Sequence, residues 1–213
     1  MSKSSQRNDE RAARLAQIQA EQRRASQRRT WIVGGVVGTL VVALVAVTSV
    51  VLIGEARRTS ALDAQAASEI DGVETFDGLV FDHVTTEVDY PQTPPAGGEH
   101  NAVWQNCGVY DAPVVNEHAV HSLEHGAVWI TYDPDLPAEQ VATLRALADG
   151  ESYVLLSPYD GLPSPVVASA WGYQLQVDDA DDERLPVFLR KYLLNPDLPE
   201  AGALCSNGVG TPA

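Results

Sequence analysis

The hydrophobic pattern divides the chain into one long apolar run near the N-terminus and a mixed region after it. Residues 31–53 form a run of 23 positions without a charged residue, dominated by Val, Leu, Ile, Ala and Gly. At about 1.5 Å per residue, a helix of this length crosses a hydrocarbon core of about 30 Å. The pattern predicts one transmembrane helix, because the run is too long and too far from the N-terminus for a cleaved signal peptide.

The charges on either side of this run predict its orientation. Residues 1–30 hold eight basic and three acidic residues, whereas only Arg57 and Arg58 are basic shortly after the run. An excess of Lys and Arg before a span places that side in the cytoplasm. We therefore expect a protein of the plasma membrane, in contact with the lipid bilayer. Its parts would be a basic cytoplasmic segment (1–30), the transmembrane helix (31–53), a linker or helical extension (54–75) and an extracytoplasmic globular domain (76–213).

Beyond residue 75, short apolar stretches alternate with stretches of helical period. Strands are expected at residues 79–84, 127–132, 153–157, 166–171 and 173–177. Helices are expected at 114–125, 137–147 and 185–193, with a Pro/Gly loop at 90–100. The predicted fold class is α+β: one N-terminal transmembrane helix followed by a single mixed α/β extracytoplasmic domain with a short sheet.

The predicted domain is strongly acidic. Residues 71–213 contain four basic and 23 acidic residues, a net charge of −19. Nucleic acids are bound through Lys and Arg, so this charge excludes nucleic-acid binding. It would attract cations and basic partners, such as a component of an envelope or respiratory membrane complex, although adaptation to a salty medium produces the same charge.

Both cysteines, Cys107 and Cys205, lie in the predicted extracytoplasmic domain. Outside the reducing cytosol, a disulfide between them is the expected state. It would close a loop of almost a hundred residues, for up to ~4.7 kcal/mol in the chain-entropy model. A redox or copper-thiolate role would need a C-x-x-C pair or a neighbouring cysteine, and the sequence has neither.

The histidines concentrate in residues 117–126 (EHAVHSLEHG), which contain three of the five in the chain. On a helix, His118, His121 and His125 would lie within about 60° of one face, a spacing that suits metal ligands. Gly126 would then end the helix, where histidines also complement the helix dipole.

Residues 121–125 (HSLEH) also match H-x-x-E-H, the pattern of the inverted zincins. Those enzymes need a longer active-site helix and a distant third ligand, so a metallopeptidase is disfavoured. Binding of copper(II) or zinc fits better, with His100 as a further imidazole and Glu117 or Glu124 as a supporting acceptor. The alternative is that these are buried polar residues satisfied by hydrogen bonds without a metal. Whether His83 joins the site is left open.

Several further motifs carry a resemblance to a known family. They are Tyr90, Pro94 and Pro95, Gly98, His100, Trp104, residues 108–110, residues 120–126, residues 170–172, Phe188, Tyr192, Pro199, Glu200 and Cys205. With them, residues 80–207 resemble the bacterial, mainly actinobacterial, membrane-anchored family called domain of unknown function 3105. The resemblance implies a single-pass anchor with its domain outside the membrane. Because His118 lies outside the conserved block of that family, the resemblance favours His100, His121 and His125, with Glu124, as the site.

These observations lead to one leading hypothesis and two alternatives. The first is a single-pass cell-envelope protein whose His/Glu site binds copper(II) or zinc in an accessory or maturation role. The second is a metal-free interaction module that docks a membrane-complex partner through its acidic surface. The third is a metal-dependent hydrolase, although a conventional enzyme is not expected.

Overall fold

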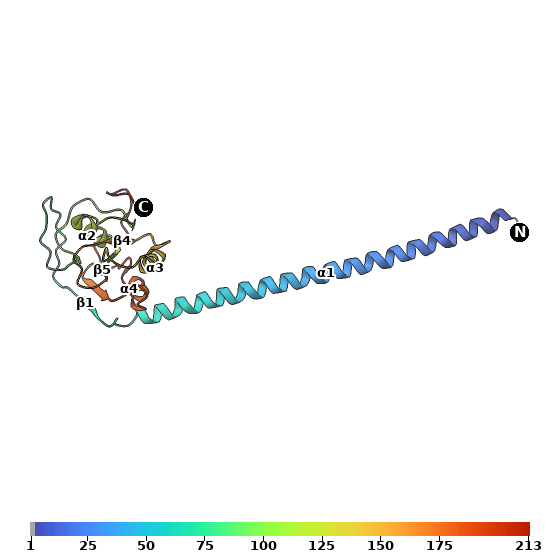
Figure 1. The fold of residues 1–213 in the computed structure, drawn as a ribbon, viewed down its shortest axis with the longest axis horizontal. Helices are drawn as coiled ribbons and strands as arrows, with labels where there is room; N and C mark the ends of the chain where they lie inside the picture. The colour runs from blue at the N-terminus through green and yellow to red at the C-terminus, as the bar shows by residue number, and fades with distance from the viewer. Residues whose placement is uncertain (1–2) are drawn as a thin grey trace. The chain divides into compact units, whose positions relative to one another are not determined.

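The computed structural model describes residues 3–213, with side chains described for Arg11 and from Ala13 onward. The described residues form four helices and one six-stranded sheet. The chain divides into two compact units, Met1–Arg58 and Thr59–Ala213 (Figure 1). Each unit is described below by itself.

Helix α1 (Lys3–Ala66) contains the long apolar run. Within it, Ala13–Ala66 is long and apolar enough to cross a membrane by length and composition. The large apolar side chains of residues 31–53 are exposed. The helix also includes residues 54–66, the first part of the stretch expected to be a linker or a helical extension.

One mixed sheet forms the centre of the unit Thr59–Ala213. Its order is β1-β6-β5-β3-β4-β2. The strands are β1 (Val73–Thr75), β2 (Gly108–Val109), β3 (Val128–Tyr132), β4 (Val154–Pro158), β5 (Val166–Ala170) and β6 (Tyr173–Val177). β2 and β3 pair with β4 in parallel, and the β3–β5, β5–β6 and β6–β1 pairs are antiparallel. The predicted mixed α/β class is confirmed.

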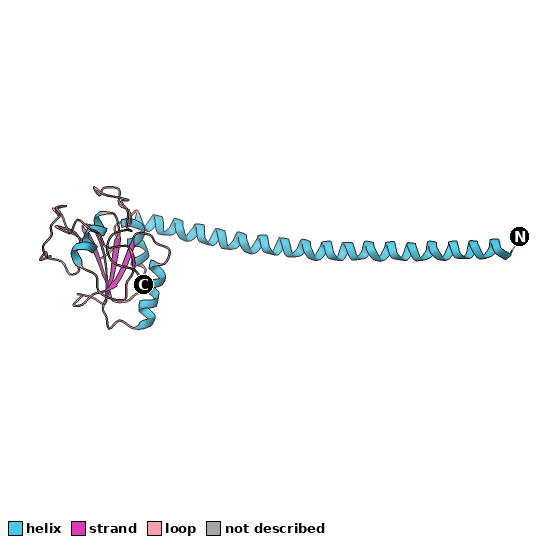
Figure 2. Ribbon diagram, turned by 90° about the horizontal axis from the view of Figure 1, so that it is seen from above, coloured by secondary structure: helices cyan, strands magenta, loops and turns pink. Residues whose placement is uncertain are grey.

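Helices cover both faces of this sheet (Figure 2). Side chains alternate between the faces along a strand, and β3 shows this clearly. Ile130 packs in one core cluster with residues of α3 (Ala138–Ala148) and α4 (Arg184–Tyr192). Trp129 packs in a second cluster with residues of α2 (Asn116–Glu124). The helix that carries the histidine-rich segment therefore lies on the opposite face from α3 and α4.

Three helices and four of the expected strands are found within two residues of their predicted bounds. The strand expected at residues 79–84 is wrong: His83 forms only an isolated bridge with His100, and the residues around it are loop. The short strands β1 and β2 were not expected, because two or three residues are too few to show a period.

The expected disulfide joins Cys107 to Cys205, with their Cα atoms 5.3 Å apart. The backbone N–H of Cys107 also donates to the carbonyl oxygen of Cys205. These links hold the C-terminal segment against the chain just before β2. They place residues 200–205 near the C-terminal end of α2, where the backbone N–H of Gly202 donates to the carbonyl oxygen of His125.

Candidate functional site

The C-terminal end of α2 presents Glu124 and His125, with His121 one turn earlier. The helix ends because Gly126 has φ +96°, a conformation that side-chain-bearing residues rarely adopt. A Cβ atom at Gly126 would also lie 2.9 Å from the Cα atom of Leu194. As predicted, this glycine ends the helix, and β3 begins two residues later.

The Pro/Gly loop, residues 90–100, is fixed to the β5–β6 hairpin. The Gln174 side-chain amide donates to the carbonyl oxygen of Pro94 at 2.9 Å, and the backbone N–H of Gly172 donates to that of Ala96 at 2.7 Å. A Cβ atom at Gly97 would lie 3.2 Å from the indole of Trp171, so the loop backbone packs directly on that ring. This docking buries His100 completely at the end of the loop.

His100 in turn positions His83 through the backbone. The N–H of His100 donates to the carbonyl oxygen of Asp82, and the N–H of Val84 donates to that of His100. The two histidine rings lie edge to face with centroids 4.9 Å apart, and His83 stacks on His121 at the same distance. The pairing that replaces the expected strand thus brings a histidine to the site.

Three imidazoles are oriented in the same way, each with Nδ1 bonded to a backbone carbonyl. The pairs are His100 with Gly98 at 2.8 Å, His121 with Asn101 at 2.6 Å and His125 with Leu204 at 2.8 Å. A carbonyl oxygen only accepts, so each Nδ1 carries a proton. In the neutral rings of His100 and His121 the lone pair is then on Nε2, whereas His125 Nε2 is hydrogen-bonded to Glu200 Oε2 at 3.1 Å. Metal-binding histidines are commonly held in this way.

The first set of ligand atoms, which we call the inner group, belongs to His83, His100, His121 and Glu124. Its ligand atoms lie within 4.8 Å of one another. His100 Nε2 is 2.9 Å from Glu124 Oε2, and these side chains are 0% and 4% exposed. Among the described residues, neither atom has a hydrogen-bond partner. A buried lone pair and a carboxylate oxygen this close need a proton or a cation between them.

Burial determines how the inner group titrates. It lowers the pKa of His100 to about 4, so this ring is neutral and available as a ligand at neutral pH. Burial, followed by the charge of Glu200, raises the pKa of Glu124 to about 7. Burial also lowers the pKa of His121. Near pH 7 a proton and a metal ion would therefore compete for the same position.

The second set of ligand atoms, the outer group, belongs to His121, His125 and Glu200. Glu200 Oε2 is 3.1 Å from His125 Nε2 and 3.5 Å from His121 Nε2. The side chain of Glu200 is 43% exposed, whereas both rings are almost fully buried. The Trp104 indole lies against both rings, with centroids 5.0 Å from His125 and 5.8 Å from His121.

The structure divides the candidate ligands differently from the sequence-based expectation. His100, His121 and Glu124 come together and His83 joins them, while His125 pairs with Glu200 instead. Glu200 was not considered as a ligand, because it is a loop residue 75 positions from His125 with no periodic pattern around it. Its only signals were its place in the family motif and its closeness to Cys205 in sequence.

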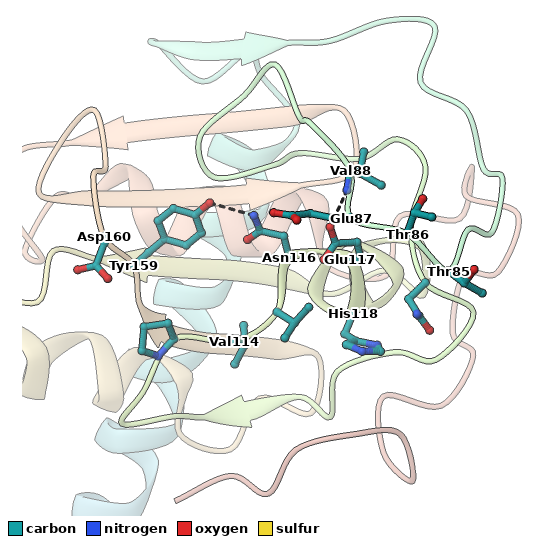
Figure 3. A pocket seen from close by; sticks show the side chains of 13 residues that line it. Thr85, Thr86, Glu87, Val88, Val114, Asn116, Glu117, His118, Tyr159 and Asp160 are labelled. Atoms are coloured by element: carbon teal, nitrogen blue, oxygen red, sulfur yellow. Dashed lines mark hydrogen bonds between the residues drawn. The ribbon is translucent and has the colours of Figure 1, made fainter.

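Glu117, expected as a supporting acceptor, and His118, expected as a ligand together with His121 and His125, belong to neither group. Glu117 Oε1 accepts a hydrogen bond from the Val88 N–H at 2.9 Å, and His118 Nδ1 donates to the carbonyl oxygen of Val103. Both residues line a separate pocket of about 580 Å³, whose wall also includes Tyr159 (Figure 3). The His118 triad is therefore not assembled.

Imidazole and carboxylate ligands suit zinc and copper(II). Soft sulfur ligands are excluded, because both cysteines are in the disulfide and the only methionine is Met1. The arrangement also differs from that of an inverted zincin. There, the Glu between the two histidines acts as the base, whereas here His121 and His125 share the outer group with Glu200 while Glu124 faces His100.

Residues 83–207 match the model of a family described as protein of unknown function (DUF3105). Because the match covers more than half of the chain, the protein belongs to this family. The matched segment contains every residue of the inner and outer groups. No curated protein and no solved structure matches the chain.

Proposed function

We propose that this member of the DUF3105 family binds one divalent transition-metal ion, copper(II) or zinc, at the inner group. One observation carries the proposal. His100 Nε2 and Glu124 Oε2 are buried, 2.9 Å apart and without hydrogen-bond partners. A metal ion between them would turn an unfavourable contact into two coordinate bonds.

The orientation of the rings supports a metal more than a polar core without one. A buried polar network is stable when every member is satisfied. In the inner group, the Nδ1 atoms of His100 and His121 are satisfied by carbonyl oxygens, and the Nε2 atoms point toward a common position. Four ligand groups match the usual coordination number of zinc, with exposed His83 on the solvent side.

The proposed location and role follow from the sequence. The uncharged run in α1, the basic residues before it and the disulfide support a single-pass anchor with a cytoplasmic N-terminus and a domain outside the membrane. In that position, a protein that holds copper(II) or zinc would serve an accessory or maturation role for envelope or respiratory complexes. The acidic surface would raise the local concentration of cations.

The test is metal content of the full-length protein in detergent, stripped with a chelator and then titrated with zinc or copper(II). The wild type should retain about one ion per chain after desalting. His121→Ala should lose it, and His118→Ala is the matched control on the same helix. Circular dichroism of each variant separates loss of ligand from loss of fold. No retained ion in a folded wild type, or equal retention in both variants, would refute the proposal.

The acidic surface favours a second candidate function, a metal-free docking module for a basic partner. The net charge of −19 and the pocket that includes Glu87, Glu117 and Asp160 support it. Association with a basic membrane-complex component should then weaken as salt screens exposed charges. Pull-downs at low and high salt test this, and it predicts that His121→Ala leaves partner binding unchanged.

A further inference from the structure

His121 belongs to both the inner and the outer group but has only one free ring nitrogen. Its Nδ1 is bonded to the carbonyl oxygen of Asn101, so Nε2 alone can bind an ion. The same Nε2 lies 3.5 Å from Glu200 Oε2 in the outer group. The inner and outer positions therefore cannot both use His121 at once, although an ion can pass from one to the other without losing this ligand.

The two groups differ in how they meet solvent. Glu200, the only carboxylate of the outer group, is 43% exposed, whereas the Glu124 side chain of the inner group is 4% exposed. A hydrated cation meets an accessible negative charge at Glu200 first, and buried ligands replace its remaining water afterwards. His125 supplies the second imidazole of this group, and an ion bound there takes the place of the hydrogen bond of 3.1 Å between His125 Nε2 and Glu200 Oε2.

We propose that the outer group is a second metal position, through which copper(II) or zinc enters and leaves the inner group by way of His121. This inference rests on the proposed metal binding at the inner group. The ion first binds Glu200, His125 and His121. It then exchanges Glu200 and His125 for His83, His100 and Glu124, while His121 stays bound. Release follows the same steps in reverse.

The C-terminal segment is held where this role requires it. The Leu204 carbonyl oxygen accepts from His125 Nδ1, and the Gly202 N–H donates to the His125 carbonyl oxygen. The disulfide of Cys205 fixes the same segment. Glu200 is therefore presented to the two rings by a constrained backbone, while its own side chain is free to reach solvent.

Two tryptophans allow the order of binding to be observed. Trp104 contacts His121 and His125, with ring centroids 5.8 and 5.0 Å away, whereas Trp171 lies 5.6 Å from His100. Copper(II) quenches a nearby indole. In stopped-flow mixing of the full-length protein with copper(II), Trp31 and Trp129 contribute to every trace. The part of the wild-type quenching that is lost in Trp104→Phe is therefore assigned to Trp104, and the part lost in Trp171→Phe to Trp171. The proposal predicts that Trp104 is quenched first and Trp171 with a delay; simultaneous quenching would overturn it.

Glu200→Gln provides the second test, because this exposed side chain can change without disturbing the core. Uptake of copper(II) and its extraction by a chelator should both slow about tenfold, the size of effect expected when a group that assists a metal is removed. Because both rates fall together, the Kd should change by much less than it does in Glu124→Gln, which removes a ligand of the inner group. Glu139→Gln, an exposed glutamate on α3 across the sheet, is the matched control and should change neither rate.

Three results would overturn the inference while the inner site stands. Unchanged rates in Glu200→Gln would remove the outer group from the route. A loss of affinity as large as that of Glu124→Gln would make Glu200 a ligand of one single site. Slower uptake in His83→Ala, with normal uptake in Glu200→Gln, would show that the ion enters past His83. By contrast, if the wild type retains no ion, the proposed metal binding at the inner group is itself refuted.

Discussion

Helix α2 has a Glu-His pair at each of its ends, Glu117 with His118 and Glu124 with His125, and the two ends behave differently. Glu117 and His118 line an open pocket, and each has a backbone partner, the Val88 N–H or the Val103 carbonyl oxygen. Glu124 is buried against His100, and its Oε2 atom has no hydrogen-bond partner among the described residues. The comparison shows that residue type alone does not make a site. A site forms where the surrounding chain buries polar atoms and leaves them unsatisfied.

Helix geometry explains why His118 is separated from the others. The spacing i, i+7 places His118 and His125 at nearly the same angle around the axis. It also separates them by about 10 Å along the axis, because each residue rises about 1.5 Å. At its own end of the helix, His118 Nδ1 is bonded to the carbonyl oxygen of Val103. His121 lies instead with residues from other segments, His83, His100 and Glu200.

The largest expected effect comes from releasing the C-terminal segment that contacts the buried end of α2. Cys107→Ser with Cys205→Ser opens a connection between residues 98 apart in sequence, which should lower the free energy of unfolding by about 4 kcal/mol. The measurement is denaturant unfolding of the full-length protein in detergent, followed by near-ultraviolet circular dichroism. A loss below about 1 kcal/mol would show that hydrogen bonds such as that of Leu204 to His125 hold the segment by themselves.

Zinc should have a smaller effect on the free energy of unfolding, and this effect should depend on His121 but not on His118. At a free concentration of 100 times its Kd, zinc should raise the free energy of unfolding by about 2.7 kcal/mol, because it binds only the folded state. The wild type and His118→Ala should both show this increase, and His121→Ala should not. Thermal unfolding with and without zinc measures it. Equal stabilisation of all three proteins would contradict the assignment of His121 as a ligand.

A third prediction compares Glu124→Gln with Glu117→Gln in the metal-free protein at pH 8. The pKa of Glu124 is raised to about 7, so at pH 8 a buried negative charge faces the lone pair of His100. A glutamine amide can donate to that lone pair, which should stabilise the fold by about 1 kcal/mol.

Glu117→Gln should be neutral, because the amide oxygen can still accept from the Val88 N–H. Denaturant unfolding of both variants in the presence of chelator measures these two changes in stability. If Glu124→Gln instead destabilises the metal-free fold, the carboxylate itself is a satisfied structural group. If the metal proposal holds, the same variant binds zinc more weakly while being more stable, the usual sign of a site optimised for function.

The sequence predicted the helices and longer strands because their apolar residues recur at clear periods, as in 138–148 and 173–177. It also placed His100, His121 and Glu124 among the candidates. It did not predict Glu200, or the separation of His125 from the inner group. These features depend on contacts between distant segments, such as Leu204 with His125, which leave no local pattern. The strand expected at residues 79–84 failed for a related reason: its apolar residues include Phe81, which stacks on Trp171 from a loop.

The smallest predicted effect is the pH dependence of the metal-free fold. Burial lowers the pKa of His121, so between about pH 7 and 5 the unfolded state takes up a proton there that the folded state does not. Stability should therefore fall as the pH falls. The pair of His100 and Glu124 adds little to the pH dependence of stability between about pH 4.5 and 6.5. In the folded state, with pKa values of about 4 for His100 and about 7 for Glu124, the pair holds one proton, which is on Glu124. In the unfolded chain the pair also holds one proton, which is on the histidine.

His121→Asn should flatten this dependence, because the amide can still donate to the Asn101 carbonyl oxygen but does not titrate. His118→Asn should keep the wild-type slope. Thermal unfolding in chelator from pH 7 to pH 5 measures both, and the wild type should lose stability as the pH falls through this range. If the dependence of stability on pH persists in His121→Asn and disappears in His118→Asn, the assignment is wrong, because His118 in the open pocket would then be the residue that resists protonation.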